Sequence, residues 1–140
     1  MSQLAIEQGL IGEAAQEVTA TQSAAHLGSG TMGVFATPAM VAFIERTCQQ
    51  LVQPMLPAGQ STVGTAIQIR HLAPTPIGAE VQARVEVTSV DGREIVFRAQ
   101  VWDEFELVGE AEHRRVVIDV DRFMKRVEAK RVKGGRAGSG

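Results

Sequence analysis

Glu45 is the residue of this sequence whose type and position most directly suggest chemistry. It lies in the segment PAMVAFIERTCQQLVQPM, whose apolar residues recur at the spacing of an α-helix. At about 100° per residue, Glu45 falls roughly 40° from Val41 and about 20° from Val52, inside the apolar stripe. A carboxylate placed there loses hydration and needs a partner, or its pKa rises. The position therefore predicts a reactive carboxylate, or a structural one that reaches the edge of the stripe or pairs with a buried arginine.

Thr37 and His71 are two further polar residues that stand at the ends of predicted elements. Thr37 precedes Pro38 at the start of the helical segment, where we expect it to be the N-cap. Its hydroxyl and the free N–H groups of a helix N-terminus also suit a carbonyl oxygen that becomes negatively charged. His71 ends a predicted strand, just before the segment APTP. A single histidine at a strand end is most often a surface residue.

The predicted strands contribute three more candidates. Gly64 interrupts a β-branched strand, which indicates a bulge or the close approach of a ligand or backbone, and the bulge is the commoner cause. By strand alternation, His113 and Arg115 share one face of the last strand. An inward Arg115 would neutralise Glu45 or hold a phosphate, whereas an outward charge at a sheet edge is the commoner arrangement.

Metal and thiol chemistry are not expected. The three histidines, His26, His71 and His113, lack metal-ligand spacing, so no metal site is predicted. Cys48 is the single cysteine, and on the apolar stripe it is expected to be a small buried residue. The chain contains no serine nucleophile elbow, dinucleotide glycine fingerprint or P-loop lysine.

The elements that must position these residues follow from periodicity and turn signals. Residues 1–15 form a weakly defined entry, and residues 26–33 (HLGSGTMG) form a glycine-rich loop. The helix runs from Thr37 until Pro54 and Pro57 end it. Its predicted stripe consists of Val41, Ile44, Cys48, Leu51, Val52 and Met55. The predicted strands are residues 16–25, 61–73, 79–90, 93–102 and 106–119, the last four favouring a meander, with a hairpin at Asp91-Gly92.

The end of the chain is predicted to add a helix and a tail. Asp121 can cap a short helix over residues 121–131. The basic run Lys125–Arg136 is expected to be a solvated helix face, with binding of a nucleotide phosphate as the alternative. We expect residues 1–133 to form a single domain and residues 134–140 to be a flexible tail.

The composition is that of one ordinary globular domain. The chain has 140 residues, of which 44% are hydrophobic and 21% charged, and its formal net charge is −2. It has no tyrosine and one tryptophan, so the interleaved basic and aromatic surface of a single-strand nucleic-acid binder is absent. No nucleic-acid partner and no membrane partner are expected, and a cytoplasmic location is predicted.

The motif combination A-T-x-x-M-x-x-x-x-E with G-T-x-I-x-x-x-H-x-A-x-T-P is present between Ala36 and Pro76. The motifs lie in the segments VFATPAMVAFIERTC and STVGTAIQIRHLAPTPIGAEVQARVEV, which VDGREIVFRAQVWDEFELVGEAEHRRVVID follows. Across these segments, most of residues 34–128 resembles the hot-dog thioesterases related to fluoroacetyl-CoA thioesterase. The resemblance implies an α+β hot-dog fold, in which an antiparallel five-stranded sheet wraps a long central helix. It also implies a homodimer paired through the sheets, or a tetramer, with the active site near the subunit interface.

The reaction implied by the resemblance is hydrolysis of an acyl-CoA thioester to free acid and CoA, without metal or cofactor. The residues that carry over as catalytic are Thr37, Glu45 and His71. Those that carry over to substrate binding are Gly64, Arg115 and Phe35.

The segment before VFAT is shorter here than in the fluoroacetyl-CoA enzyme, where it supplies an aromatic gate, and Thr31 aligns nearest to that gate. A general short- or medium-chain acyl-CoA thioesterase is therefore expected. The alternatives are a non-catalytic acyl-CoA or small-ligand binding module and, less in keeping with these motifs, a hydratase.

Overall fold

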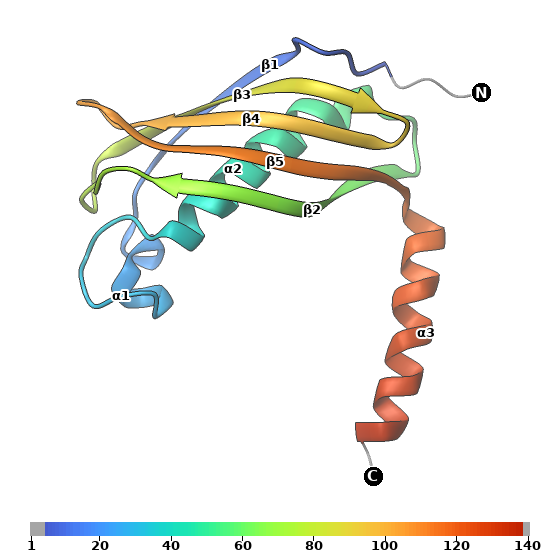
Figure 1. The fold of residues 1–140 in the computed structure, drawn as a ribbon. Coiled ribbons are helices and arrows are strands. Elements are labelled where there is room, and N and C mark those ends of the chain that lie inside the picture. Colours follow the sequence, from blue (N-terminus) through green and yellow to red (C-terminus); the bar gives the residue numbers. More distant parts are fainter. Residues whose placement is uncertain (1–4, 139–140) are drawn as a thin grey trace.

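The computed structural model describes residues 5–138 and shows one antiparallel sheet curved around a long helix (Figure 1). The sheet consists of β1 (Ile11–Glu17), β2 (Gln60–His71), β3 (Glu80–Asp91), β4 (Glu94–Trp102) and β5 (Leu107–Asp119). The helices are α1 (Ala24–Leu27), α2 (Thr37–Val52) and α3 (Val120–Gly138), with short 3₁₀ turns η1 (Ala20–Gln22) and η2 (Gln53–Met55). The predicted arrangement of a long helix and a five-stranded antiparallel sheet is confirmed.

The strand order is β1–β3–β4–β5–β2. Strands β3, β4 and β5 are consecutive antiparallel neighbours, and Gly92 takes a φ of 61° in the β3–β4 turn, where a side chain would be strained. The prediction that β2 joins this meander is wrong, because β2 pairs with β5 instead. The connection after β2 contains Pro74 and Pro76 and cannot form a tight hairpin, so β2 lies at an edge of the sheet.

Helix α2 packs its apolar face on the inner surface of the sheet. Its N-cap is Ala36, and Thr37 is the first helical residue, so the prediction that Thr37 is the cap is wrong. The buried face is also rotated from the predicted stripe, because Val41 and Leu51 are only half-buried and Met55 lies outside the helix. The buried residues of α2 are Ala39, Met40, Phe43, Ile44, Thr47, Cys48 and Val52.

The N-terminal region differs most from prediction. The first strand is β1, residues 11–17, rather than residues 16–25, and it pairs with β3. Residues 20–27 instead form η1 and α1. Thr19 and Gln22 make a capping box, and the Ser23 side chain accepts a hydrogen bond from the His26 N–H. These local hydrogen bonds end the extended conformation that the alternating sequence suggested.

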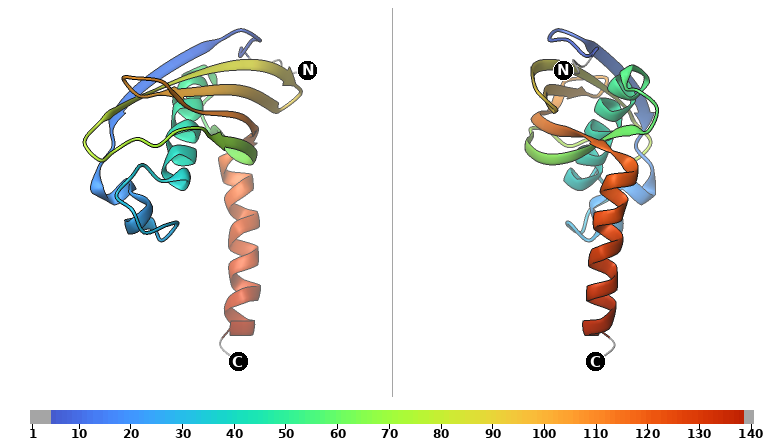
Figure 2. Two further views of the ribbon diagram at one scale, coloured as in Figure 1. Left: turned by 60° about the vertical axis from the view of Figure 1, so that its left-hand side comes forward. Right: turned by 90° about the vertical axis from the view of Figure 1, so that its right-hand side faces the viewer.

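Helix α3 is longer than predicted and projects from the body of the molecule (Figure 2). It begins at Val120, so Asp121 lies in its first turn instead of capping it. It continues to Gly138, into the segment expected to be a tail; residues 139–140 lie outside the described residues, and the domain limits stay a prediction. Within residues 5–138, no helix is both long enough and apolar enough to cross a membrane.

Candidate functional site

Glu45 lies at the border of the buried face of α2 rather than inside it. Its side chain is 41% exposed, and its Oε2 atom lies 3.6 Å from Nη1 of Arg115. Arg115 extends from the inner face of β5, and its side chain is only 7% exposed. The inward orientation of Arg115, the less common of the two possibilities for a strand arginine, is therefore the correct one. Of the two structural readings of Glu45, the pairing with a buried arginine is present.

The guanidinium of Arg115 is held on every side by polar groups. Its Nε donates to the Thr62 hydroxyl at 2.8 Å, and its Nη2 donates to the Thr62 carbonyl at 3.1 Å. Nη2 also donates to Oε1 of Gln49 at 3.3 Å, while the Thr62 hydroxyl donates to the same oxygen. Nη1 contacts Nε2 of His113 at 3.1 Å, on the same side as Glu45. Four N–H donors of this buried cation are thus hydrogen-bonded and the remaining one is on the side of Glu45, which fixes the position of the charge beside the carboxylate.

His113 is fully buried beside Arg115, and its protonation follows from its contacts. Arginine has no acceptor, so Nε2 of His113 accepts the hydrogen bond from Arg115 Nη1. Nδ1 then carries the proton and donates to the Ala66 carbonyl at 2.8 Å. Burial lowers the pKa of His113 from its ordinary value, and the positive charge of Arg115 lowers it further. His113 is therefore neutral and supports the arginine without adding charge.

Gly64 provides the space that Glu45 occupies. A Cβ atom at this position would stand 2.7 Å from Glu45 Oε2 and 3.1 Å from Cε1 of His113. Between Gly64 and Ala66 the pairing of β2 with β5 shifts register, which is the predicted bulge. The bulge is therefore confirmed, while the groups that come close to Gly64 are side chains and not the ligand or backbone of the other reading.

Thr37 and His71 form a second pair of candidate residues. The hydroxyl of Thr37 is hydrogen-bonded to Nδ1 of His71 at 2.8 Å, and this bond joins the start of α2 to the end of β2. In the described chain Nε2 of His71 is buried without a hydrogen-bond partner. Burial lowers the pKa of His71. An orphaned ring nitrogen is costly unless another molecule pairs with it, so His71 is suited to contact a ligand.

The remaining predicted residues lie in the core. Phe35 is buried, and its backbone N–H donates to the Thr75 carbonyl at 2.9 Å. Its role in substrate binding stays a prediction. Cys48 is buried, and burial raises the pKa of its thiol to about 12. The thiol stays protonated at neutral pH and is not a nucleophile.

Gln49 and Thr62 are members of the site that the sequence analysis missed. Gln49 follows Glu45 by four residues on a helix, and Thr62 precedes Gly64 by two residues on a strand. Both spacings place a residue on the same face as its neighbour. The polar partners could therefore have been found by following each candidate one helical turn or one strand repeat along the chain.

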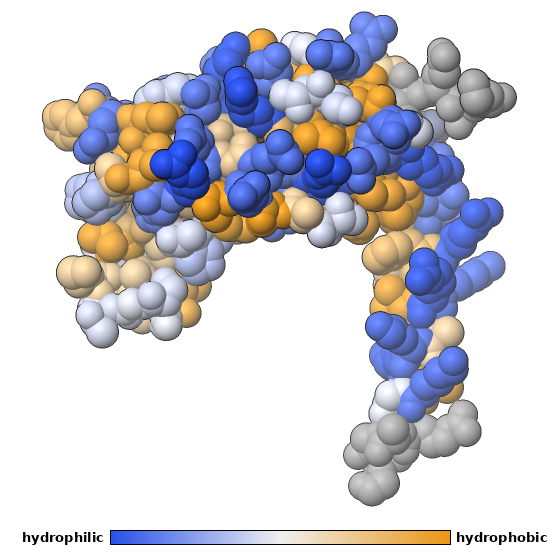
Figure 3. All heavy atoms as spheres, in the orientation of Figure 1, coloured by the Kyte–Doolittle hydropathy of each residue, from blue (hydrophilic) through white to orange (hydrophobic). Residues whose placement is uncertain are grey.

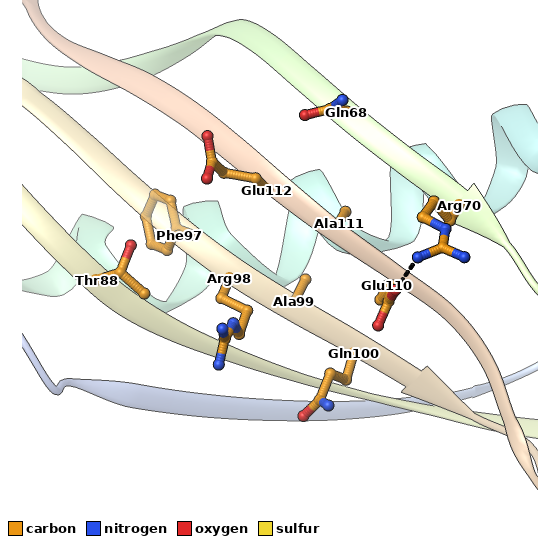
Figure 4. A pocket seen from close by; sticks show the side chains of 10 residues that line it. All are labelled: Gln68, Arg70, Thr88, Phe97, Arg98, Ala99, Gln100, Glu110, Ala111 and Glu112. Atoms are coloured by element: carbon orange, nitrogen blue, oxygen red, sulfur yellow. Dashed lines mark hydrogen bonds and ion pairs between the residues drawn. The ribbon is translucent and has the colours of Figure 1, made fainter.

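The outer face of the sheet holds a hollow of about 710 Å³ that contains none of the candidate residues (Figure 4). Two of its charged side chains, Arg70 and Glu110, form an ion pair at 3.1 Å, and Glu112 pairs at 3.6 Å with Arg114, which lies outside the hollow. The surface around it mixes hydrophilic and hydrophobic residues (Figure 3). The candidate residues lie on the opposite, inner face, between α2, β2 and β5.

The described residues bring no three His, Cys, Asp or Glu side chains together in a group that could hold a metal ion. The candidate residues form two separate groups. The Glu45 carboxylate lies beside the Arg115 cation in the space that Gly64 leaves. The His71 ring, whose Nε2 has no partner among the described residues, is hydrogen-bonded to Thr37. Thr37 and Glu45 are eight residues apart on α2, about 12 Å. The Glu45 carboxylate is suited to general base or nucleophilic attack on a carbonyl group.

Comparison with known proteins places this geometry in context. The profile of the family described as fluoroacetyl-CoA-specific thioesterase matches residues 18–121. The fluoroacetyl-CoA thioesterase of Streptantibioticus cattleyicolor is 37% identical over 97 residues, which cover 69% of this chain and 70% of that protein.

Solved structures resemble the chain over most of its length. A structure of fluoroacetyl-CoA thioesterase superposes with a TM-score of 0.85 at 30% identity, covering 89% of this chain and 97% of that one. A variant of that enzyme solved with acetyl-CoA gives a TM-score of 0.86 at 30% identity, covering 89% and 98%. A thioesterase superfamily member from Thermus thermophilus, at 20% identity, a TM-score of 0.87 and coverage of 94% and 97%, shares the fold.

Proposed function

Because the chain belongs to the fluoroacetyl-CoA-specific thioesterase family, we propose that it hydrolyses a small acyl-CoA thioester to the free acid and CoA. The observation that carries the proposal is the position of the Glu45 carboxylate, 3.6 Å from the buried Arg115 and in the space that Gly64 leaves by having no side chain. The carboxylate is fixed by a cation, yet a large part of it is exposed to an incoming molecule.

Glu45 is the proposed reacting group. As a nucleophile it would attack the thioester carbonyl, form a mixed anhydride with the acyl group and release CoA as the thiol before water hydrolyses the anhydride. As a general base it would take a proton from the attacking water, and no bond to Glu45 would form. Mass spectrometry of rapidly quenched enzyme separates the two routes, since only the first adds the acyl mass to the peptide that contains Glu45.

His71 and Thr37 are the proposed partners of the substrate. Nε2 of His71 lacks a protein partner and can pair with the thioester carbonyl or with the attacking water. The Thr37 hydroxyl holds Nδ1 of the same ring at 2.8 Å and thereby sets its orientation. Thr37 also stands in the first turn of α2, where free backbone N–H groups stabilise a developing oxyanion.

The proposed reaction uses these side chains and water, and CoA enters only as part of the substrate. A homodimer paired through the sheets is the proposed active form, because β1 and β2 leave the two sheet edges free. The cytoplasm is the proposed compartment, since the single cysteine, Cys48, requires no oxidising environment.

The experiment is a thiol-release screen over acyl-CoA substrates from acetyl-CoA to lauroyl-CoA, including fluoroacetyl-CoA. We expect turnover of at least one substrate, and a loss of about 100-fold or more in kcat for Glu45→Gln, which keeps the shape and removes the charge. Glu110→Gln, which alters an exposed ion pair on the outer face, is the matched control and should retain parental activity. Tight acyl-CoA binding without thiol release would identify a binding module instead.

A further inference from the structure

The formal charge of the molecule is distributed unevenly between helix α3 and the rest of the chain. It contains seven Lys or Arg residues and two acidic residues, a formal charge of +5. The whole chain carries −2, so the rest of the chain carries −7. The blue side chains along the projecting helix in Figure 3 belong to this basic segment. A helix with this charge is expected to attract anions.

The arginines nearest the domain line a small hollow where α3 leaves β5. The hollow has a volume of about 120 Å³, and Arg93, Arg122 and Arg126 all line it. Arg93 comes from the β3–β4 turn, while Arg122 and Arg126 are one helical turn apart on α3. Guanidinium groups from two separate elements therefore border one space. Its size fits a phosphate group rather than a whole nucleotide.

The positive charge of this hollow is only partly neutralised. Arg93 lies 3.5 Å from the carboxylate of Asp119, which also lines the hollow. Among the side chains that the structure describes, neither Arg122 nor Arg126 takes part in an ion pair. A net excess of two guanidinium charges remains, and guanidinium is the group that recognises phosphate by paired hydrogen bonds.

A continuous line of polar side chains connects the site of Glu45 with this hollow. Gln49, which contacts Arg115, donates to the Ser61 hydroxyl at 3.2 Å. Ser61 donates to Gln53 at 2.9 Å, and Gln53 donates to the Gln60 carbonyl at 2.9 Å. The Gln60 side chain donates to Asp119 at 3.2 Å, at the edge of the hollow. The seam between the end of α2 and the start of β2 is thus polar from Gln49 to Gln60.

The spacing of the two ends suits a CoA thioester. Arg115 and Asp119 are separated by four residues of β5, or about 13 Å. Asp119 itself lines the hollow. The extended pantetheine arm that joins a thioester to the CoA diphosphate is long enough to span this separation. We propose that the hollow lined by Arg93, Arg122 and Arg126 binds a phosphate group of the CoA nucleotide while the thioester lies at Glu45; this proposal rests on the proposed thioesterase function.

The test compares two thioesters of the same acyl group, one carried by CoA and the other by N-acetylcysteamine, which has no phosphate. The variant is Arg122→Gln/Arg126→Gln. Its matched control is Lys130→Gln/Lys133→Gln, which removes the same charge from α3 outside the hollow. We expect the arginine variant to raise KM for the acyl-CoA about tenfold, while kcat/KM for the N-acetylcysteamine thioester stays within about twofold of the parent.

Three kinetic results would overturn the proposal: an unchanged KM for acyl-CoA, an equal loss with both thioesters, or an equal loss in the lysine control. If the protein hydrolyses neither thioester, the proposed function fails but the phosphate site is still testable. Calorimetric titration with adenosine 3′,5′-bisphosphate then measures binding to the hollow directly. We expect binding to the parent and about tenfold weaker binding to the arginine variant. Equal binding to both proteins, or no binding to the parent, would contradict a phosphate site.

Discussion

Arg115 and Glu45 form an ion pair in which the arginine is deeply buried and the glutamate is not. The arginine side chain is 7% exposed and the glutamate side chain 41%, with 3.6 Å between Nη1 and Oε2. The cation therefore depends on its protein contacts, whereas the carboxylate remains hydrated in part. Removing the arginine and removing the glutamate should therefore change the free energy of unfolding by different amounts.

Arg115→Met is expected to lower the free energy of unfolding by about 2–3 kcal/mol, because the Thr62 carbonyl and Nε2 of His113 lose their donor. Urea denaturation measures the change. Arg114→Met, on the outer face of the same strand, removes only surface ion pairs and should cost no more than about 0.5 kcal/mol. Equal losses in the two variants would show that the network around Arg115 adds no stability.

Gly64→Ala is expected to reduce kcat/KM by about 10- to 100-fold, because the new Cβ would stand 2.7 Å from Glu45 Oε2 and displace the carboxylate. Steady-state thiol release measures the loss. Gly134→Ala adds a methyl group where nothing lies within 4 Å, and it should retain parental activity. Parental kinetics in Gly64→Ala would mean that the close approach to Glu45 has no catalytic consequence.

Thr37→Val is expected to lower kcat about tenfold or more while leaving the unfolding midpoint nearly unchanged, because Thr37 is exposed and its hydroxyl serves His71. Thr37→Ser keeps the hydroxyl and should recover most of the activity. If the serine variant were as impaired as the valine variant, the hydrogen bond to His71 would not explain the role of Thr37.

The stability of the protein should fall as the pH drops below about 6.5. Burial depresses the pKa of His113 and of His71 below that ordinary value, so the unfolded chain takes up protons first as the pH falls. Unfolding is therefore favoured between pH 6.5 and the lower folded-state pKa values, and no stability is lost to these groups above pH 6.5. Denaturation midpoints measured across this range should show a shallower slope for His113→Gln than for the parent protein.

The elements with strong local signals were predictable from the sequence. The alternation of Val81, Ala83 and Val85 with polar residues identified β3, and Asp91-Gly92 identified its hairpin. The partner of β2 was not predictable in this way, because pairing across the sheet depends on long-range packing rather than on turn residues. The first strand was misplaced for a related reason: β1 is an edge strand rich in alanine and glycine, and its pairing with β3 outweighs its weak local preference.

The candidate site was predictable residue by residue but not as an arrangement. Helical spacing singled out Glu45, and strand alternation placed Arg115 on a common face with His113. Periodicity could not show that Glu45 lies at the border of the buried face, since a rotation by one residue changes which side chains α2 buries. The hydrogen bond between Thr37 and His71 joins residues 34 positions apart, and no local pattern predicts such a contact.

The burial of Cys48 has a practical consequence for how this protein can be measured. It is the single thiol of the chain, and burial raises its pKa to about 12. A disulfide reagent that reacts with thiolates would therefore respond to released CoA and not to the folded protein. In denaturant the same reagent would gain one equivalent of signal per chain. The same colorimetric reaction thus reports product formation when the protein is folded, and it reports the number of unfolded chains when the protein is denatured.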